Sequence, residues 1–322
     1  MAPVRPFTVD PVLTALSITY RNEAQNLIAD KVLPRVPVGG EKYSWTEYPV
    51  AERFTFPDTE VGRRGRVPRV EFSGIERTEN TRDYGLEDGI PNSDINEAAA
   101  MRSRGLGNFD PVTTATEGLT DLLLTDREVR AAELIQNPAN YAAARRIALS
   151  GTDRFSDYDN SRPIELLKSG FNGTLIFRPN TMVISREGWS QLSSHPQIVN
   201  AVRGQTTTRG IVSVEEFVRL FSGEGLKEVH IGEAFVNIAR KGQEANIQRV
   251  WGKSVSLLHV NPQARPNGTL AFGMTAQYGT RFAGTWEDRN VGLEGGTVVR
   301  VGEKVHEFVM AKDLGYLFQN AF

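Results

Sequence analysis

The stretch between Asp110 and Pro138 constrains the fold of this 322-residue chain more than any other. Asp110 suits a helix N-cap, and Pro111 suits the first helical turn, where its missing N–H would have no partner. Asn137-Pro138 ends the helix, because proline disfavours helical geometry in the residue before it. At about 1.5 Å per residue, a helix over residues 111–137 forms a rod of about 40 Å. The sequence therefore predicts a spine helix on which other segments pack.

Apolar residues recur along this helix at three- and four-residue steps, which predicts one buried face. They are Val112, Ala115, Leu119, Leu122 and Val129, with Leu123 beside them. From this segment alone, an ordinary long core helix of an α+β domain is an equally good interpretation.

Composition excludes several classes of protein. The absence of cysteine rules out disulfides, thiolate nucleophiles and zinc sites built on sulfur. A net charge of −2 is too balanced for a dedicated nucleic-acid binder, so any DNA contact should be weak and nonspecific. No run approaches the length of a membrane span, and the first residues do not resemble a signal peptide. We expect a cytoplasmic origin and no membrane.

Residues 1–40 have the composition of an arm. Pro11 to Ala29 is the one amphipathic helix candidate, and prolines interrupt regular structure on both sides of it. The segment contains too little apolar surface to fold independently, so we expect a partner surface, supplied by another copy of the chain, to hold it.

Residues 41 to about 90 have the composition of one long, irregular hairpin, with short alternating runs broken by prolines. Limbs of about 25 residues at roughly 3.3 Å each reach up to about 80 Å. The body of a compact chain of this length has a radius of gyration of about 20 Å and could not cover such a hairpin. Another copy of the chain is the economical partner. The alternative is a hairpin that folds back on its own domain.

Opposite charges separate the tip of this hairpin from the segment that follows it. The tip carries arginines, whereas the acidic segment, residues 76–97, carries seven acids against two arginines. We hypothesise that the tip of one subunit meets the acidic segment, or another acidic face, of a neighbour. The residues concerned are Arg63, Arg64, Arg66 and Arg69 in the tip and Glu76, Glu79, Asp83, Glu87 and Asp88 in the acidic segment.

The second half of the chain alternates strand and helix signals. Ser185 is an expected N-cap, and Ser213 with Glu216 forms a capping box. The predicted elements are strands at 181–185, 227–231 and 254–260, helices from 185 towards 195, from 198 to 204 and after 213, and a strand pair at 297–301 and 305–310 around Gly302-Glu303.

No motif of a known catalytic chemistry is present, and the four histidines are isolated. Asp153, Asp157 and Asp159 resemble part of a calcium loop but lack its central glycine and terminal glutamate, so acidic turn residues are the better interpretation. The sequence predicts no catalytic, metal-binding or cofactor-binding residue.

The order of these parts resembles the major capsid proteins of tailed bacteriophages, with the Hong Kong 97-type shell fold. The resemblance spans nearly the whole chain and rests on short stretches that are specific only in combination. They are Leu119 to Tyr141, Leu149-Ser-Gly151 with Phe155 to Tyr158, Pro179 to Ile184 with Trp189 and His195-Pro196, and Ile247 to Val260 with Trp251-Gly252.

The resemblance implies an α+β fold divided as that family is. The expected units are an N-terminal arm (1–40), an extended hairpin called the E-loop (41–95), a peripheral domain with the spine helix (96–155), an axial domain (156–280) and a return to the peripheral sheet (281–322). Some relatives crosslink through an E-loop lysine. Here the only lysine between residues 41 and 90 is Lys42, near the base, so we expect no crosslink.

The implied function is a structural head protein whose copies form pentamers and hexamers and enclose double-stranded DNA in the virion, after assembly in the host cytoplasm. Scaffold and portal proteins are expected partners. Because the arm is too short to include a fused scaffolding domain, the resemblance implies either a separate scaffold or processing of the chain. A cementing protein is a further possible partner. Two alternatives stay open, an encapsulin-like nanocompartment shell and a soluble α+β enzyme with an unrecognised site.

Overall fold

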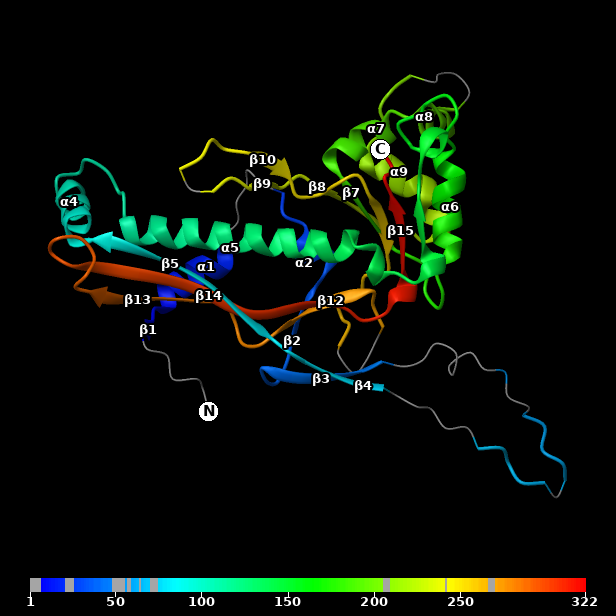
Figure 1. Ribbon diagram of the computed structural model, residues 1–322, viewed down its shortest axis with the longest axis horizontal. Helices are drawn as coiled ribbons and strands as arrows, with labels where there is room; N and C mark the ends of the chain where they lie inside the picture. The colour runs from blue at the N-terminus through cyan, green and yellow to red at the C-terminus, as the bar shows by residue number, and fades with distance from the viewer. Residues whose placement is uncertain are drawn as a thin grey trace.

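The computed structural model shows two β-sheets linked by one long helix, with a hairpin extending from one side (Figure 1). It describes residues 7–20, 26–47, 56, 59–63, 65–69, 75–204, 209–240, 242–265 and 270–322. Among the helices in these ranges, none is long and apolar enough to cross a membrane.

The linking helix is α5, Pro111–Gln136, and its ends follow the sequence signals. The Asp110 side chain accepts a hydrogen bond from the Thr113 N–H at 3.3 Å, and Asn137 is the C-cap. Asn137 also caps the 3₁₀ turn that follows, so the chain leaves the helix at once. The predicted spine helix is confirmed.

The first sheet lies along α5 and contains six of the described strands, in the order β1-β13-β14-β12-β2, with β5 on the free edge of β14. The bounds are Thr8–Val9 (β1), Phe282–Asp288 (β13), Gly296–Val309 (β14), Gly273–Gln277 (β12), Arg35–Pro37 (β2) and Arg82–Pro91 (β5). All pairs are antiparallel except β2 with β12. The long strand β14 therefore organises the sheet.

The buried face of α5 is rotated from the expected one. Leu119 and Leu123 pack on Val299 and Val301 of β14 as expected, but Leu122 is 59% exposed. Polar residues continue the buried face in its place, namely Thr116, Thr120, Arg127 and Glu128, followed by Ala131, Ala132 and Ile135. The predicted buried face of α5 was wrong at Leu122, because the pattern of apolar residues alone does not show which polar residues have buried partners.

The second sheet has the order β6-β15-β11-β7-β8 among the described strands. The bounds are Arg146–Ala148 (β6), Gly315–Gln319 (β15), Val255–Leu258 (β11), Thr181–Ser185 (β7) and Glu228–Gly232 (β8). One face packs on helices Pro163–Gly173 (α6), Arg186–Ser193 (α7), Pro196–Arg203 (α8) and Val214–Phe221 (α9). The capping of α7 by Ser185 and the capping box of α9 are confirmed.

Alternate residues of the second sheet serve two cores, as the pleat requires. Met182 and Ile184 face the helices α6 to α9, whereas Val183 faces the C-terminal end of α5. A small hairpin, Phe235–Asn237 (β9) with Ile247–Arg249 (β10), leaves this sheet and lies over α5 (Figure 1). The C-terminal third of α5 therefore joins the two sheets.

The N-terminal arm is held by the first sheet and by α5 of its own chain, so the expectation that a partner surface holds it was wrong for the described residues. Its helices are Pro11–Thr19 (α1) and Ala29–Val32 (α2). The expected single helix from Pro11 to Ala29 was wrong, because α1 ends at its C-cap Tyr20, which has extended geometry.

The hairpin is shorter at its base than expected. Lys42–Glu47 (β3) pairs with Ile75–Asn80 (β4), and β5 then continues into the first sheet instead of a hairpin limb. Beyond β5 the chain forms Asn92–Ser103 (α4).

Two expectations about the C-terminal part were wrong. Residues 297–301 and 305–309 belong to one strand, β14, because Glu303 finds buried cationic partners where a turn was expected. The chain also changes sheets at other points than expected: β12, at 273–277, already lies in the first sheet, and β15, at 315–319, lies in the second.

Candidate assembly interface

The base of the hairpin is anchored by aromatic side chains on β14. Trp45 and Tyr43 are buried against Phe308, with ring centroids 5.5 and 5.8 Å from it. The Tyr43 hydroxyl lies 2.8 Å from His306 Nδ1. Burial lowers the pKa of His306, which favours the neutral ring. The anchor fixes the direction in which the hairpin leaves the body.

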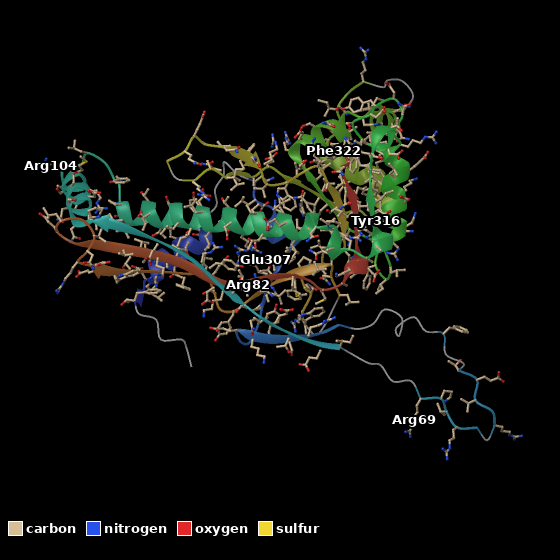
Figure 2. All side chains as sticks on the ribbon, in the orientation of Figure 1. Arg69, Arg82, Arg104, Glu307, Tyr316 and Phe322 are labelled. Atoms are coloured by element: carbon tan, nitrogen blue, oxygen red, sulfur yellow. The ribbon has the colours of Figure 1, made fainter. Side chains whose placement is uncertain are left out.

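The described tip residues are exposed and lie far from the body. Arg69 lies on the outer part of the loop, on the limb that returns towards β4, well away from Arg82 and Glu307 in the sheet (Figure 2). Phe56 is 97% exposed and Val67 is 74% exposed. Arg63 and Arg66 are exposed as well, and Arg64 lies outside the described residues. The tip thus presents cationic and apolar groups together.

Part of the acidic segment is already paired within the chain. Glu87 and Arg300 are directly opposite on β5 and β14, and their side chains form an ion pair at 2.5 Å. Asp83 pairs with Lys304 at 3.4 Å, and Lys304 also pairs with Glu41 at 2.5 Å. These two acids hold β5 on β14.

The other predicted acids face outward. Glu76 and Glu79 lie on β4, where every residue is exposed, and Asp88 lies on β5. The structure spreads the acidic set over β4, which pairs with β3 in a separate two-stranded sheet, and over β5, which pairs with β14 in the first sheet. It does not bring the described tip arginines near these acids within one chain.

A buried cluster of ion pairs, which the sequence interpretation missed, joins the arm, α5 and β14. Arg35 of β2 and Arg281 bind Glu303 at 2.8 and 3.1 Å. Arg127, 1% exposed, pairs with Asp30 of α2 and with Glu307 at 3.4 Å. The only hint in the sequence was Arg127-Glu128, two charged residues in the phase of the buried helix face.

The neighbouring arginines determine the protonation state of the carboxyl groups in this cluster. Burial alone would raise the pKa of Asp30, but Arg127 and Arg35 lower it to about 2. Arg35 and Arg281 likewise lower the pKa of Glu303 below its ordinary value, despite burial. Both carboxyl groups are therefore charged at neutral pH.

Glu128 forms a separate junction beside this cluster. Its carboxylate accepts from the backbone N–H groups of Ile28 and Ala29 at 3.0 and 2.8 Å, and from Trp251 Nε1 at 2.7 Å. Burial raises the pKa of Glu128, and these hydrogen bonds oppose the rise. One side chain therefore ties the arm, the spine helix and the second sheet together.

The side chains considered for chemistry have structural roles. Asp157 accepts from the backbone of Asp159 and Asn160, as in an ordinary turn. His195 caps α8 and His259 stacks on Phe177. Among the described residues, no group of three acidic or histidine side chains is placed to hold a metal ion.

Comparison with known proteins gives relatives over the whole length. No protein-family model matches the chain. A major capsid protein of Pseudomonas phage JBD67 is 41% identical over 98% of both chains. A major capsid protein of Burkholderia phage BcepMu is 26% identical over 96% of this chain and 95% of its own.

Solved structures share the fold. A phage-related protein of Bordetella bronchiseptica matches with a TM-score of 0.73 at 22% identity, over 98% of both chains. The capsid protein of cyanophage P-SCSP1u matches with a TM-score of 0.57 at 13% identity, over 92% of this chain and 88% of its own. The predicted Hong Kong 97-type fold is thereby confirmed. With the hairpin, the spine helix and the two sheets in place, the chain belongs to the major capsid proteins of tailed bacteriophages, the structural subunits of the virion head.

Proposed function

We propose that the chain builds the head shell by extending its hairpin onto a neighbouring copy. The arginine tip of one copy then contacts the exposed acidic residues along β4 and β5 of the other. One observation carries this proposal: the hairpin is anchored at its base by Trp45 and Tyr43, while the described tip residues stand away from the body (Figure 1). A hairpin with a packed base and a solvent-exposed tip is suited to contacting another subunit.

Charge supports the direction of the contact. Arg63, Arg66 and Arg69 are exposed at the tip, whereas Glu76, Glu79 and Asp88 are exposed along β4 and β5. Complementary charges at the rim of an interface mainly set encounter rate and register, and each exposed pair contributes about 0–1 kcal/mol. Many copies of a weak contact sum in a closed shell.

The expectations about subunit rings, enclosed DNA and partner proteins that the sequence raised are part of this proposal. Rings of five and six copies would close the shell around double-stranded DNA, with only nonspecific contact to it. A separate scaffold and a portal protein would act during assembly in the host cytoplasm, and a cementing protein could cap the product. The role is structural and not enzymatic. Membership of a capsid protein family favours it over both the nanocompartment and the soluble enzyme.

The test is assembly of a tip variant. We expect the triple variant Arg63→Ser, Arg66→Ser and Arg69→Ser to assemble more slowly and to lose most of the salt sensitivity of the wild-type reaction, because exposed charges are screened by salt. Mass photometry and negative-stain electron microscopy across a salt series measure both effects.

A matched control removes three arginines elsewhere. Arg154, Arg162 and Arg219 are exposed on or near the helices that cover the second sheet, and their replacement by serine should leave the salt response unchanged. A tip variant that assembles at the wild-type rate with the wild-type salt response would contradict the proposal.

A further inference from the structure

The β3–β4 ribbon, residues 42–47 paired with residues 75–80, packs on its own body through one face of β3 (Figure 1). Tyr43 and Trp45 are buried in a cluster with Phe308 of β14 and with Met274 and Ala276 of β12. Every residue of β4, in contrast, is exposed. The two aromatic side chains of β3 therefore hold the ribbon against the first sheet.

Short connections join this ribbon to the rest of the chain. Gly39 and Gly40 lie between β2 and β3, and a Cβ on Gly39 would meet no atom within 4 Å, so the backbone there is unhindered. Thr81 alone lies between β4 and β5, and its N–H donates to the Glu41 carbonyl at 2.8 Å. A few residues at the ends of elements are sufficient to absorb the changes in φ and ψ of a hinge. The ribbon can therefore turn as a unit while both sheets stay intact.

The closed position of the ribbon, with its aromatic face on β14, has a cost at Trp45. The side chain is buried, and its Nε1 has no hydrogen-bond partner among the described residues. A buried donor without a partner is unfavourable, and exposure of the indole to water would remove this penalty. The closed position therefore combines favourable aromatic packing on Phe308 with one unfavourable buried group.

His306 is the side chain in this contact whose ordinary pKa lies near neutral pH. Its Nδ1 lies 2.8 Å from the Tyr43 hydroxyl, and its ring stacks on Phe308 with the centroids 5.8 Å apart. His306 is half-buried and also lines a cavity of about 380 Å³ between β5, β14 and the C-terminal part of α5. A proton can therefore reach the ring from solvent while the ribbon is closed.

Charged and titratable groups surround His306 on several elements, whereas β12 places the uncharged Ala276 opposite it. Besides Tyr43, they are Glu79 on β4, Arg82 and Tyr84 on β5, Arg130 and Glu133 on α5, and Lys304 and Glu307 on β14. Burial lowers the pKa of His306 and Arg82 adds to the effect, while Glu79 and Glu307 oppose it. In the closed position the neutral ring is therefore favoured.

Protonation of His306 works against the closed position. A ring that is released to solvent regains its ordinary pKa of 6.5, so the open position binds the proton more tightly than the closed one. The contribution of His306 to the closed position is therefore complete above pH 6.5 and declines as the pH falls below that value.

We propose that the hairpin base is a pH-sensitive latch, in which neutral His306 keeps Tyr43 and Trp45 on β14 and protonated His306 releases them. On release, the β3–β4 ribbon turns about the hinge at residues 39–40 and Thr81. The direction of the hairpin then changes while the first sheet stays folded. This inference goes beyond the proposed function, because it concerns a single subunit and does not depend on what the tip contacts.

Fluorine NMR of the dissociated subunit labelled with 5-fluorotryptophan tests the latch, because the chain contains only four tryptophans and each gives its own signal. Trp45→Phe assigns the signal of Trp45. We expect this signal to move towards the position of an exposed indole as the pH is lowered from 7.5 to 5.0. The signals of Trp189 and Trp286, which lie outside the latch, should stay in place.

Three variants identify the titrating group. His306→Gln keeps a hydrogen-bonding side chain that cannot become charged, so the Trp45 signal should no longer depend on pH. His259→Gln is the matched control, because burial lowers the pKa of His259 as well and its ring stacks on Phe177, outside the latch. It should respond to pH as the wild type does. Tyr43→Phe should raise the ratio of open to closed ribbon about fivefold at pH 7.5, through the loss of one hydrogen bond.

A Trp45 signal that does not respond to pH in the wild-type subunit, or that responds equally in His306→Gln, would overturn the latch. Movement of all four tryptophan signals together would also overturn it, since that indicates general unfolding. If His306→Gln does not fold, Tyr43→Phe decides, because a wild-type ratio in that variant would contradict the latch. The salt response of the tip variant tests the proposed function separately, so the two can fail independently.

Discussion

Trp251 and Glu128 are joined by a 2.7 Å hydrogen bond from the indole Nε1 to the carboxylate, although 123 residues separate them. The same carboxylate accepts from the backbone of Ile28 and Ala29 in the arm. The position of the arm on the spine helix is therefore linked to that of the second sheet.

Replacing Glu128 with glutamine should destabilise the subunit by about 1–3 kcal/mol, because the new amide N–H₂ faces N–H donors and leaves buried groups unpaired. Urea denaturation of the dissociated subunit measures the loss. Glu133→Gln, at an exposed position of the same helix, is the matched control and should change little. Equal stability of the two variants would contradict the role given to Glu128.

Replacing Glu303 with alanine should cost about 3–5 kcal/mol, because removing one partner of a buried ion pair leaves the others uncompensated. Arg281, which pairs with Glu303 at 3.1 Å, is itself only 6% exposed. The comparison is with Glu294→Ala in the exposed turn before β14, which should be neutral. A loss below about 1 kcal/mol, the range of a surface pair, would show that the cluster is effectively solvated.

Acid should weaken the attachment of the arm. The pKa of Asp30 is lower in the folded chain than its ordinary value of 3.8, so its contribution to stability is complete above that value and is lost as pH falls towards about 2. Glu303, whose pKa is also lowered, acts in the same direction.

Hydrogen exchange of the amides of residues 31–33, which donate to backbone carbonyls of the arm, measures this loss when it is followed from pH 5 down to pH 2 after correction for the intrinsic rate. Asp30→Asn should show less dependence on pH across the same window. Protection that stays constant down to pH 2 in the wild-type chain would contradict the assignment.

Replacing Trp45 with alanine should loosen the base of the hairpin, because a buried tryptophan contributes about 3–5 kcal/mol to local packing. The β3 and β4 amides should exchange faster while α5 amides keep their protection. Phe56→Ala, at a tip position that is 97% exposed, should leave both unchanged. Loss of protection throughout the chain would show that Trp45 supports the whole fold.

Local signals in the sequence were sufficient to predict the ends of helices that are set by neighbouring capping residues. Asp110 and Asn137 bound α5, and Ser213 with Glu216 starts α9, because capping acts within one turn. Remote pairing was not predictable in the same way. The turn expected at Gly302-Glu303 does not exist, since Arg35 and Arg281, distant in sequence, neutralise Glu303 inside a continuous strand.

The site was predicted in outline only. The charge contrast between tip and acidic segment was visible in the sequence, but the pairing of Asp83 and Glu87 with residues of β14 depends on strand register. Leu122 was assigned to the core because its spacing fits a buried stripe. Its 59% exposure shows that spacing alone does not fix the phase of a helix face.

Glu303 also has a consequence for how the first sheet folds. A slip of β14 by one residue against β5 would turn Glu303 outward and insert Lys304 among Arg35, Arg127 and Arg281, since neighbouring strand residues point to opposite faces. Misaligned pairings of this long strand would therefore be unstable within the subunit, before any shell forms. The side chain of Glu303 alone would favour the native register of the sheet.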